Sequence, residues 1–217
     1  MSNTCLVTGG AGFIGCAISA GLADAFDRVV VIDNLHPQIH AERKRPAALD
    51  ARVELVVDDV TDAAAWDRLL TTVKPDVVVH LAAETGTGQS LTEGTRHANV
   101  NVVGTTQMLD AFVRADALPK RVVLTLSRAT YGEGAWRDKA DGAIVYPGQR
   151  SQAMLERGEW DFPGLECLPF EATKVNVRPT SIYGATKLAQ EHVLTSWALS
   201  FGIDVAILRL QNVYGPG

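Results

Sequence analysis

The fold is decided by the stretch Thr8-Gly9-Gly10-Ala11-Gly12-Phe13-Ile14-Gly15, which fits two glycine patterns at once. It matches G-x-x-G-x-x-G through Gly9, Gly12 and Gly15, and G-x-G-x-x-G when read from Gly10. An early glycine permits a tight turn, a middle one lets a pyrophosphate approach the backbone, and the last lets a helix pack closely on a sheet. Free N–H groups at the start of that helix would hold the anion.

The position of this loop makes the pattern specific, because such glycine patterns are weak evidence alone. The loop lies between a predicted strand, Thr4–Thr8, and a predicted helix, Phe13–Ala23, at the start of the chain. We therefore predict a dinucleotide-binding turn. The alternative is a purely structural glycine-rich turn.

Clusters rich in Val and Ile alternate with segments of helical period along the rest of the chain. The predicted strands are 4–8, 28–32, 53–57, 76–81, 121–126 and 205–210, and the predicted helices are 13–23, 61–73, 99–115 and 181–201. Continuous apolar strands between helices are typical of a parallel sheet covered on both faces. The sequence thus predicts an α/β, doubly wound parallel sheet of the Rossmann type.

Two segments depart from this alternation. Residues 33–50 form a polar loop whose Arg43-Lys44-Arg45 run we interpret as a solvated face, with contact to a nucleotide as the alternative. Residues 133–178 form a long insertion with glycines, prolines and two tryptophans, and loops of that length are usually lids, binding elements or disordered excursions. We expect residues 1–217 to be one dinucleotide-binding domain, with nothing after strand 205–210 for a separate substrate domain.

The composition excludes several classes of protein. With 217 residues, 47% of them apolar and 21% charged, the chain has the balance of a soluble globular domain. No apolar run is long enough to cross a bilayer, and the start of the chain lacks a secretory signal. A net charge of −5 disfavours binding to nucleic acid. Three cysteines, an odd number without metal-ligand spacing, favour a reducing, cytoplasmic location.

Asp33 closes the second predicted strand, 18 residues after Gly15. A carboxylate there accepts hydrogen bonds from the adenosine ribose and repels a 2′-phosphate, which favours NAD over NADP. The alternative, a 2′-phosphate held by Arg43 or Arg45, is opposed by Asp33 itself.

Tyr183 and Lys187 stand four residues apart at the start of a predicted helix, so they share one helix face. A free tyrosine titrates near 10, too high for a base at neutral pH. We expect the lysine ammonium, together with a nicotinamide cation, to lower the pKa of the phenol. This spacing occurs by chance in surface helices, and the preceding dinucleotide loop is what favours the catalytic interpretation.

Several motifs follow the glycine loop in order: Asp33-Asn34, Asp59-Val60, His80-Leu81-Ala82-Ala83, Tyr183-x-x-x-Lys187 and Asn212-Val213-Tyr214-Gly215-Pro216. As a set, they resemble the extended short-chain dehydrogenase/reductases, specifically the NAD-dependent nucleotide-sugar epimerases and dehydratases. The segment 80–90 and the insertion after Tyr131 look similar to the dTDP-L-rhamnose 4-epimerase branch.

The resemblance implies a role for each matching residue. It implies a catalytic set of Ser127, Tyr183 and Lys187, the last two also contacting the nicotinamide ribose, and Asn101 as the helix asparagine near the site. The implied NAD contacts are Gly9, Gly12, Phe13 and Ile14 for the pyrophosphate, Asp33 and Asn34 for the ribose, Asp59 and Val60 for the adenine, and Leu81, Ala82 and Ala83 for the inner half. Thr85, Ser127 and Asn212 are the implied substrate contacts.

Two departures from the family pattern limit the implied reaction. Dehydratases of the family carry Asp-Glu after the catalytic hydroxyl, where this chain has Arg128-Ala129, so water loss has no evident catalyst. The family's C-terminal nucleotide-sugar domain is also absent from these residues. The sequence therefore predicts a nucleotide-sugar 4-epimerase with NAD as cofactor, no metal, and a homodimer as the assembly. The alternatives are a 4-keto reductase or dehydrogenase, and a non-catalytic dinucleotide-binding protein.

Overall fold

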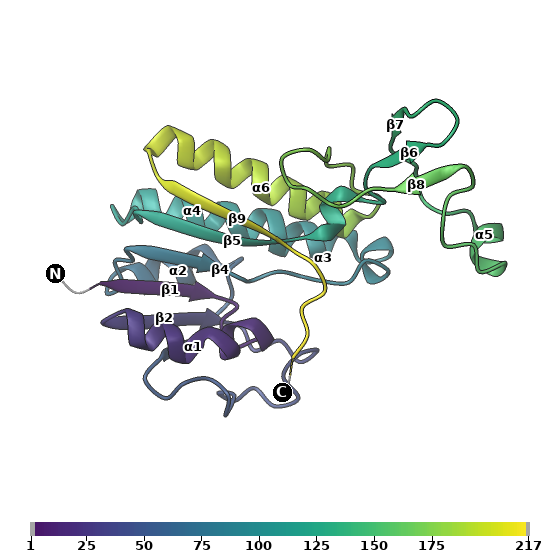
Figure 1. The fold of residues 1–217 in the computed structure, drawn as a ribbon. Coiled ribbons are helices and arrows are strands. Elements are labelled where there is room, and N and C mark those ends of the chain that lie inside the picture. Colours follow the sequence, from purple (N-terminus) through teal and green to yellow (C-terminus); the bar gives the residue numbers. More distant parts are fainter. Residues whose placement is uncertain (1–2, 216–217) are drawn as a thin grey trace.

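A computed structural model describes residues 3–215 and contains one six-stranded parallel sheet (Figure 1). Its strands lie in the order β3-β2-β1-β4-β5-β9, and neighbouring strands all run parallel. Their bounds are β1 Thr4–Thr8, β2 Arg28–Asp33, β3 Glu54–Val57, β4 Val77–His80, β5 Arg121–Ser127 and β9 Asp204–Leu210. The predicted doubly wound sheet is confirmed. The strand order reverses between β1 and β4, the point where such sheets bind ligands.

Helices cover both faces of the sheet. One apolar cluster packs α1 (Phe13–Ala25) against β1 and β2, with Cys5 in its centre. The other packs α2 (Ala63–Leu70), α4 (Gly104–Arg114) and α6 (Ile182–Phe201) against the opposite face. Trp66 and Phe112 are fully buried there and meet edge to face at 6.1 Å. None of the helices described between residues 3 and 215 is long and apolar enough to cross a membrane.

The predicted helix 99–115 is interrupted in the structure. It consists of α3 (Gly94–Ala98), a π-helical turn η2 (Asn99–Val103) and α4, so helical structure also begins earlier than predicted. The wide turn places Asn101 in the interior, fully buried. π-turns of this kind are frequent at functional sites.

Residues 133–178, the predicted insertion, form a small projecting subdomain with short strands of its own (Figure 1). Strands β6 (Trp136–Asp138), β7 (Ile144–Val145) and β8 (Leu165–Cys167) make an antiparallel sheet, and α5 (Gln152–Glu156) lies between them in sequence. Strands of two or three residues are too short to show an alternation of apolar and polar residues in the sequence. The subdomain is organised instead by the buried Trp136, whose ring meets Phe162 edge to face at 5.1 Å.

Four residues lie outside the described part of the chain: Met1, Ser2, Pro216 and Gly217. The expectation that the chain lacks a secretory signal concerns a segment whose first two residues are not described. Pro216, the last residue of the Asn212–Pro216 motif, also lies outside the described residues. The predicted single-domain organisation of residues 1–217 stays a prediction.

Candidate functional site

The glycine loop turns between β1 and α1 in contact with two neighbouring strands. Gly9 has a positive φ of 66°, and its N–H donates to the Ile32 carbonyl at 2.8 Å. A Cβ on Gly9 would lie 2.6 Å from the backbone nitrogen of Ala82, so only glycine fits. The loop therefore sits where the carboxyl ends of β2 and β4 flank β1.

The start of α1 faces this loop without a side-chain cap. Gly12 occupies the N-cap position, and no side chain caps the helix there. The first turn, which lies within the described residues, carries no acidic residue. First-turn N–H groups of a helix need partners from outside it. Because the positive end of the helix dipole also lies here, the position suits a pyrophosphate.

Two carboxylates are held rigidly after β2 and β3. Asp33 accepts from the Ala11 N–H at 3.0 Å through Oδ2 and from the Leu35 N–H at 2.8 Å through Oδ1. Asp59 accepts from the Asn34 amide at 2.9 Å and from Thr61. Burial alone would raise the pKa of Asp59, but the hydrogen bonds from Asn34 and Thr61 bring that pKa below its usual value. Both groups therefore offer charged acceptors to a ligand.

A cavity of about 490 Å³ joins these features. Such a volume lies within the range of small-molecule and cofactor sites. Every predicted NAD contact outside α6, and the predicted substrate contact Thr85, lines it: Gly9, Gly12, Phe13, Ile14, Asp33, Asn34, Asp59, Val60, Leu81, Ala82, Ala83 and Thr85. The structure brings these residues together around one cavity, and their roles stay predictions.

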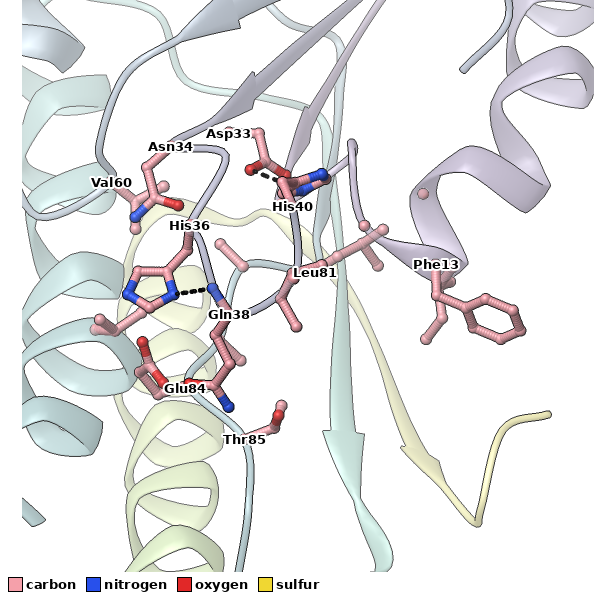
Figure 2. A pocket seen from close by; sticks show the side chains of 18 of the residues that line it. Phe13, Asp33, Asn34, His36, Gln38, His40, Val60, Leu81, Glu84 and Thr85 are labelled. Carbon is pink, nitrogen blue, oxygen red and sulfur yellow. Dashed lines mark hydrogen bonds and ion pairs between the residues drawn. The ribbon is translucent and has the colours of Figure 1, made fainter. Parts of the chain in front are cut away.

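The cavity also contains residues that the sequence reasoning missed. His36, Gln38 and His40 come from the 33–50 loop, which folds over the cavity (Figure 2). His40 Nε2 lies 3.9 Å from Asp33 Oδ1. Gln38 donates to Gln89 at 3.3 Å, tying the loop to the segment after β4. No periodic pattern signals these positions, because long-range contacts set them.

The predicted catalytic residues come from β5 and α6. Ser127 ends β5, and its Oγ accepts from the Ala129 N–H at 3.1 Å. Tyr183 lies in the first turn of α6, which Ser181 caps by accepting from the Gly184 N–H. A Cβ on Gly184 would lie 2.5 Å from the Ala129 carbonyl oxygen, so this glycine lets the turn after β5 pack closely on α6. The Ser127 side chain lies close enough to Tyr183 to influence the pKa of the phenol.

The pKa of Tyr183 differs from the expectation. In the protein alone, burial raises this pKa above its ordinary value, and the hydrogen bond from Ser127 only opposes the rise. Lys187 does not contribute to this shift, and its Nζ donates to Gln190 Oε1 at 2.5 Å. Lys187 is itself buried, and burial lowers its pKa to about 7.

Two side chains, His97 of α3 and Asn101 of η2, connect the cavity to α6. His97 contacts the Thr85 carbonyl at 3.2 Å and packs edge to face on the Tyr183 ring at 6.2 Å. Asn101 donates to the Glu84 carbonyl at 3.1 Å and to the Thr186 hydroxyl at 3.0 Å. Ser127, Tyr183 and Lys187 do not line the cavity themselves. Asn212 is exposed after β9 and lies outside it.

The histidines are not arranged for metal binding in residues 3–215, where no group of three or more His, Cys, Asp or Glu side chains is placed to hold an ion. His80 is buried and hydrogen-bonded to Thr8 and Thr105.

The buried Lys187 predicts a pH dependence of folding stability. Its pKa is about 7 in the folded protein and near 10.5 when exposed, so the unfolded chain binds the proton more tightly. Below pH 7 the folded protein carries the full free-energy penalty of burying a charged lysine. The penalty disappears as the pH rises toward 10, because the lysine is then neutral in the unfolded chain as well. We expect the free energy of unfolding of the NAD-free protein to rise over this window, by a few kcal/mol at most. Lys187→Met should abolish the rise.

Urea unfolding at several pH values measures this effect. Lys139→Met is the matched control, because Lys139 is exposed in the insertion. A slope that is the same in the Lys187 variant and in the control variant would contradict the prediction.

Comparisons with known proteins agree with this geometry. Residues 5–151 and 163–217 match the model of the NAD dependent epimerase/dehydratase family. A dTDP-L-rhamnose 4-epimerase of Burkholderia thailandensis is 64% identical over 98% of this chain and 58% of its own length. A dTDP-glucose 4,6-dehydratase of Escherichia coli is 27% identical over 97% of this chain and 54% of its own length.

Solved structures give the same result. A UDP-glucose 4-epimerase of Thermotoga maritima, solved with UDP-glucose, has a TM-score of 0.74 and 25% identity over 98% of this chain and 57% of its own. The corresponding Thermus thermophilus enzyme, solved with NAD, has a TM-score of 0.72 and 29% identity over 98% and 56%. The chain spans little more than half the length of these relatives. The expected family is confirmed, and the chain belongs to the NAD dependent epimerase/dehydratase family.

Proposed function

We propose that this protein is a nucleotide-sugar 4-epimerase that uses tightly bound NAD for transient oxidation at the sugar C4. The observation that carries the proposal is the continuity of the cavity with the catalytic helix. His97 contacts both Thr85, at the inner end of the cavity, and the ring of Tyr183. A ligand that fills the cavity from the glycine loop inward therefore ends beside the phenol.

The residues present fit a dinucleotide. Gly9, Gly12, Phe13 and Ile14 would hold its pyrophosphate. No side chain caps the start of α1, so the N–H groups of its first turn are left to bind the anion. Asp33 and Asn34 would bind the adenosine ribose, Asp59 and Val60 the adenine, and Leu81, Ala82 and Ala83 the inner half. Tyr183 and Lys187, on α6 beyond the cavity lining, would contact the nicotinamide ribose. When bound, the dinucleotide supplies the acceptor and donor of hydride.

Ser127, Tyr183 and Lys187 divide the proton chemistry. The Tyr183 oxygen takes the proton of the sugar 4-hydroxyl and returns it after the sugar has turned over. Ser127, whose side chain favours the phenolate of Tyr183, holds the same sugar oxygen. Because burial keeps Tyr183 neutral in the protein alone, a positive charge from the cofactor side is needed to favour the phenolate. Lys187, one helical turn after Tyr183 on α6, is the cationic residue of that helix and would add to this effect.

The proposed substrate is a dTDP-linked 6-deoxyhexose, dTDP-L-rhamnose in the first instance. The 64% identity with the Burkholderia protein supports this choice. Thr85 and Asn212 would contact the substrate, Asn212 near its pyrophosphate. Arg128 and Ala129 follow Ser127 in the turn η3 (Arg128–Tyr131), so neither residue supplies the carboxyl group needed for dehydration.

The assembly and location belong to the same proposal. We propose a homodimer formed through the helical face of residues 99–115 and 181–201, where Val103, Val113 and Leu199 are exposed apolar side chains. We also propose a reducing, cytoplasmic compartment, supported by three cysteines that are all unpaired within residues 3–215.

The test incubates the natural full-length protein with dTDP-L-rhamnose and follows both product stereochemistry and the near-ultraviolet absorbance of reduced nicotinamide. An epimerase produces the C4 epimer with no net change in absorbance. A stoichiometric change in absorbance would replace the proposal with a reductase or dehydrogenase. Binding of NAD and of the sugar nucleotide without any turnover would indicate a binding protein.

A further inference from the structure

A buried polar chain connects the lysine of the site to the first strand of the sheet. Lys187 Nζ donates to Gln190 Oε1 at 2.5 Å, and Gln190 Nε2 contacts Thr105 Oγ1 at 2.8 Å and His80 Nε2 at 3.0 Å. His80 Nδ1 in turn lies 2.5 Å from Thr8 Oγ1. All five side chains are almost completely buried, at 2% exposure or less.

We propose that Gln190 is the positioning residue of Lys187, and that neutral His80 orients its amide so that the amide oxygen faces the lysine. The proposal deepens the epimerase function above and rests on it for its catalytic consequence. Gln190 lies one turn after Lys187 on α6 and was not singled out by the sequence motifs.

The direction of each hydrogen bond follows from the donors available. The Thr105 hydroxyl donates to the Asn101 carbonyl at 2.7 Å, so its oxygen is left to accept from the Gln190 amide nitrogen. The second N–H of that nitrogen faces His80 Nε2, which must then carry a lone pair. This arrangement corresponds to a neutral His80 with its proton on Nδ1, donated to Thr8 Oγ1, while the Thr105 hydroxyl also lies 2.9 Å from His80 Nε2.

The other orientation of the Gln190 amide is unfavourable, because it would turn the NH₂ group toward the Lys187 ammonium. Protonating His80 on Nε2 would direct its N–H toward both the Thr105 oxygen, at 2.9 Å, and the Gln190 NH₂ group, at 3.0 Å. The second of these contacts would be between two donors, and a buried polar group without a partner costs about 1–3 kcal/mol.

The surrounding charges do not compete for Lys187. Tyr183 is the titratable neighbour on α6, His80 faces the network from β4, and His97 of α3 packs on Tyr183. Two nearby carboxylates are already paired: Glu191 with Arg209 at 2.6 Å, and Glu84 with Arg96 at 3.1 Å. Burial and the charge of Lys187 lower the pKa of His80 to about 3, which agrees with its neutral state.

This arrangement gives the lysine an acceptor without a counter-charge. A neutral amide oxygen fixes the position of the ammonium and leaves its positive charge uncompensated. A carboxylate at the same position would favour the charged lysine, whereas an apolar side chain would disfavour it. Replacements of Gln190 should therefore move the lysine titration in opposite directions, which a general packing defect would not do.

The experiment uses the NAD-loaded full-length protein, labelled with ¹³C in lysine and ¹⁵N in histidine, with Lys187→Met identifying the Lys187 signal. In the natural protein, the ¹⁵N shifts should place the His80 proton on Nδ1. Gln190→Glu should raise the midpoint of the Lys187 titration by about one pH unit or more, and Gln190→Leu should lower it similarly. The alkaline limit of kcat should move in the same directions.

Shifts in one direction for both variants, or none, would overturn the proposal. So would a His80 proton on Nε2 in the natural protein, a measurement that decides the matter even if neither variant folds. If the titrations behave as expected while no sugar nucleotide is epimerised, the proposed function fails and the lysine-positioning network stands.

Discussion

Tyr183→Phe is expected to reduce epimerase turnover by about 10²–10⁴-fold, the usual contribution of a positioned proton-transfer group. The substitution removes one oxygen and keeps the ring, so the edge-to-face contact with His97 and the packing of α6 are preserved. NAD should be retained, because Lys187 and the predicted NAD contacts that line the cavity are all unchanged. Turnover of dTDP-L-rhamnose and the NAD released on denaturation measure the two effects.

Tyr146→Phe is the matched control for this experiment. Tyr146 lies in the insertion, where its hydroxyl accepts from the Asn176 N–H at 3.1 Å. Its replacement removes one hydrogen bond of the same kind, worth about 1 kcal/mol of stability, with no loss of turnover. Equal turnover in the Tyr183 and Tyr146 variants would eliminate the proposed role of Tyr183.

The sheet was predictable because its central strands are buried on both faces. All five residues of β1 are buried, and so are five of the six residues of β2. The middle of such strands is apolar, as in Cys5–Val7 and Val29–Ile32, and these residues form continuous runs in the sequence. The glycine loop was predictable for the same reason: it requires residues without a Cβ at fixed positions between a strand and a helix.

The break in the helix 99–115 could not be predicted from local sequence. The π-turn is held by tertiary contacts of Asn101, which donates to the Glu84 carbonyl and to the Thr186 hydroxyl. Both partners come from elements distant in the chain. A local pattern of apolar residues does not record such contacts, so the segment reads as an uninterrupted helix.

The site divides in the same way. Positions directly after strands, such as Asp33 and Ala82, follow from topology, because parallel strands deliver their carboxyl ends to one edge. Gln38 and His40 reach the cavity through a loop whose course depends on contacts with Gln89 and Asp33. Gln190 was missed because its significance comes from His80, far away in sequence.

Gly15→Ala is expected to destabilise the protein by about 1–3 kcal/mol or more and to abolish NAD binding. A Cβ on Gly15 would lie 2.5 Å from the Gly10 carbonyl carbon and closer still to two other backbone atoms of Gly10. Gly10 has no room to retreat, since a Cβ on it would itself lie 2.6 Å from a methyl group of Val31. The helix or the loop must therefore shift, and the anion seat shifts with it.

Gly21→Ala in the same helix separates this clash from the ordinary effect of replacing a helical glycine. A Cβ on Gly21 would meet nothing within 4 Å, so the variant gains only the better helix propensity of alanine. That gain is about 1 kcal/mol, opposite in sign to the effect at Gly15. Urea unfolding and NAD titration of the two variants give the comparison. Both changes add one methyl group to α1, so they differ only in what that methyl group meets. A Gly15 variant that is as stable as the Gly21 variant and still binds NAD would show that α1 can move away from Gly10. The close contact between helix and loop would then have no role in forming the pyrophosphate site.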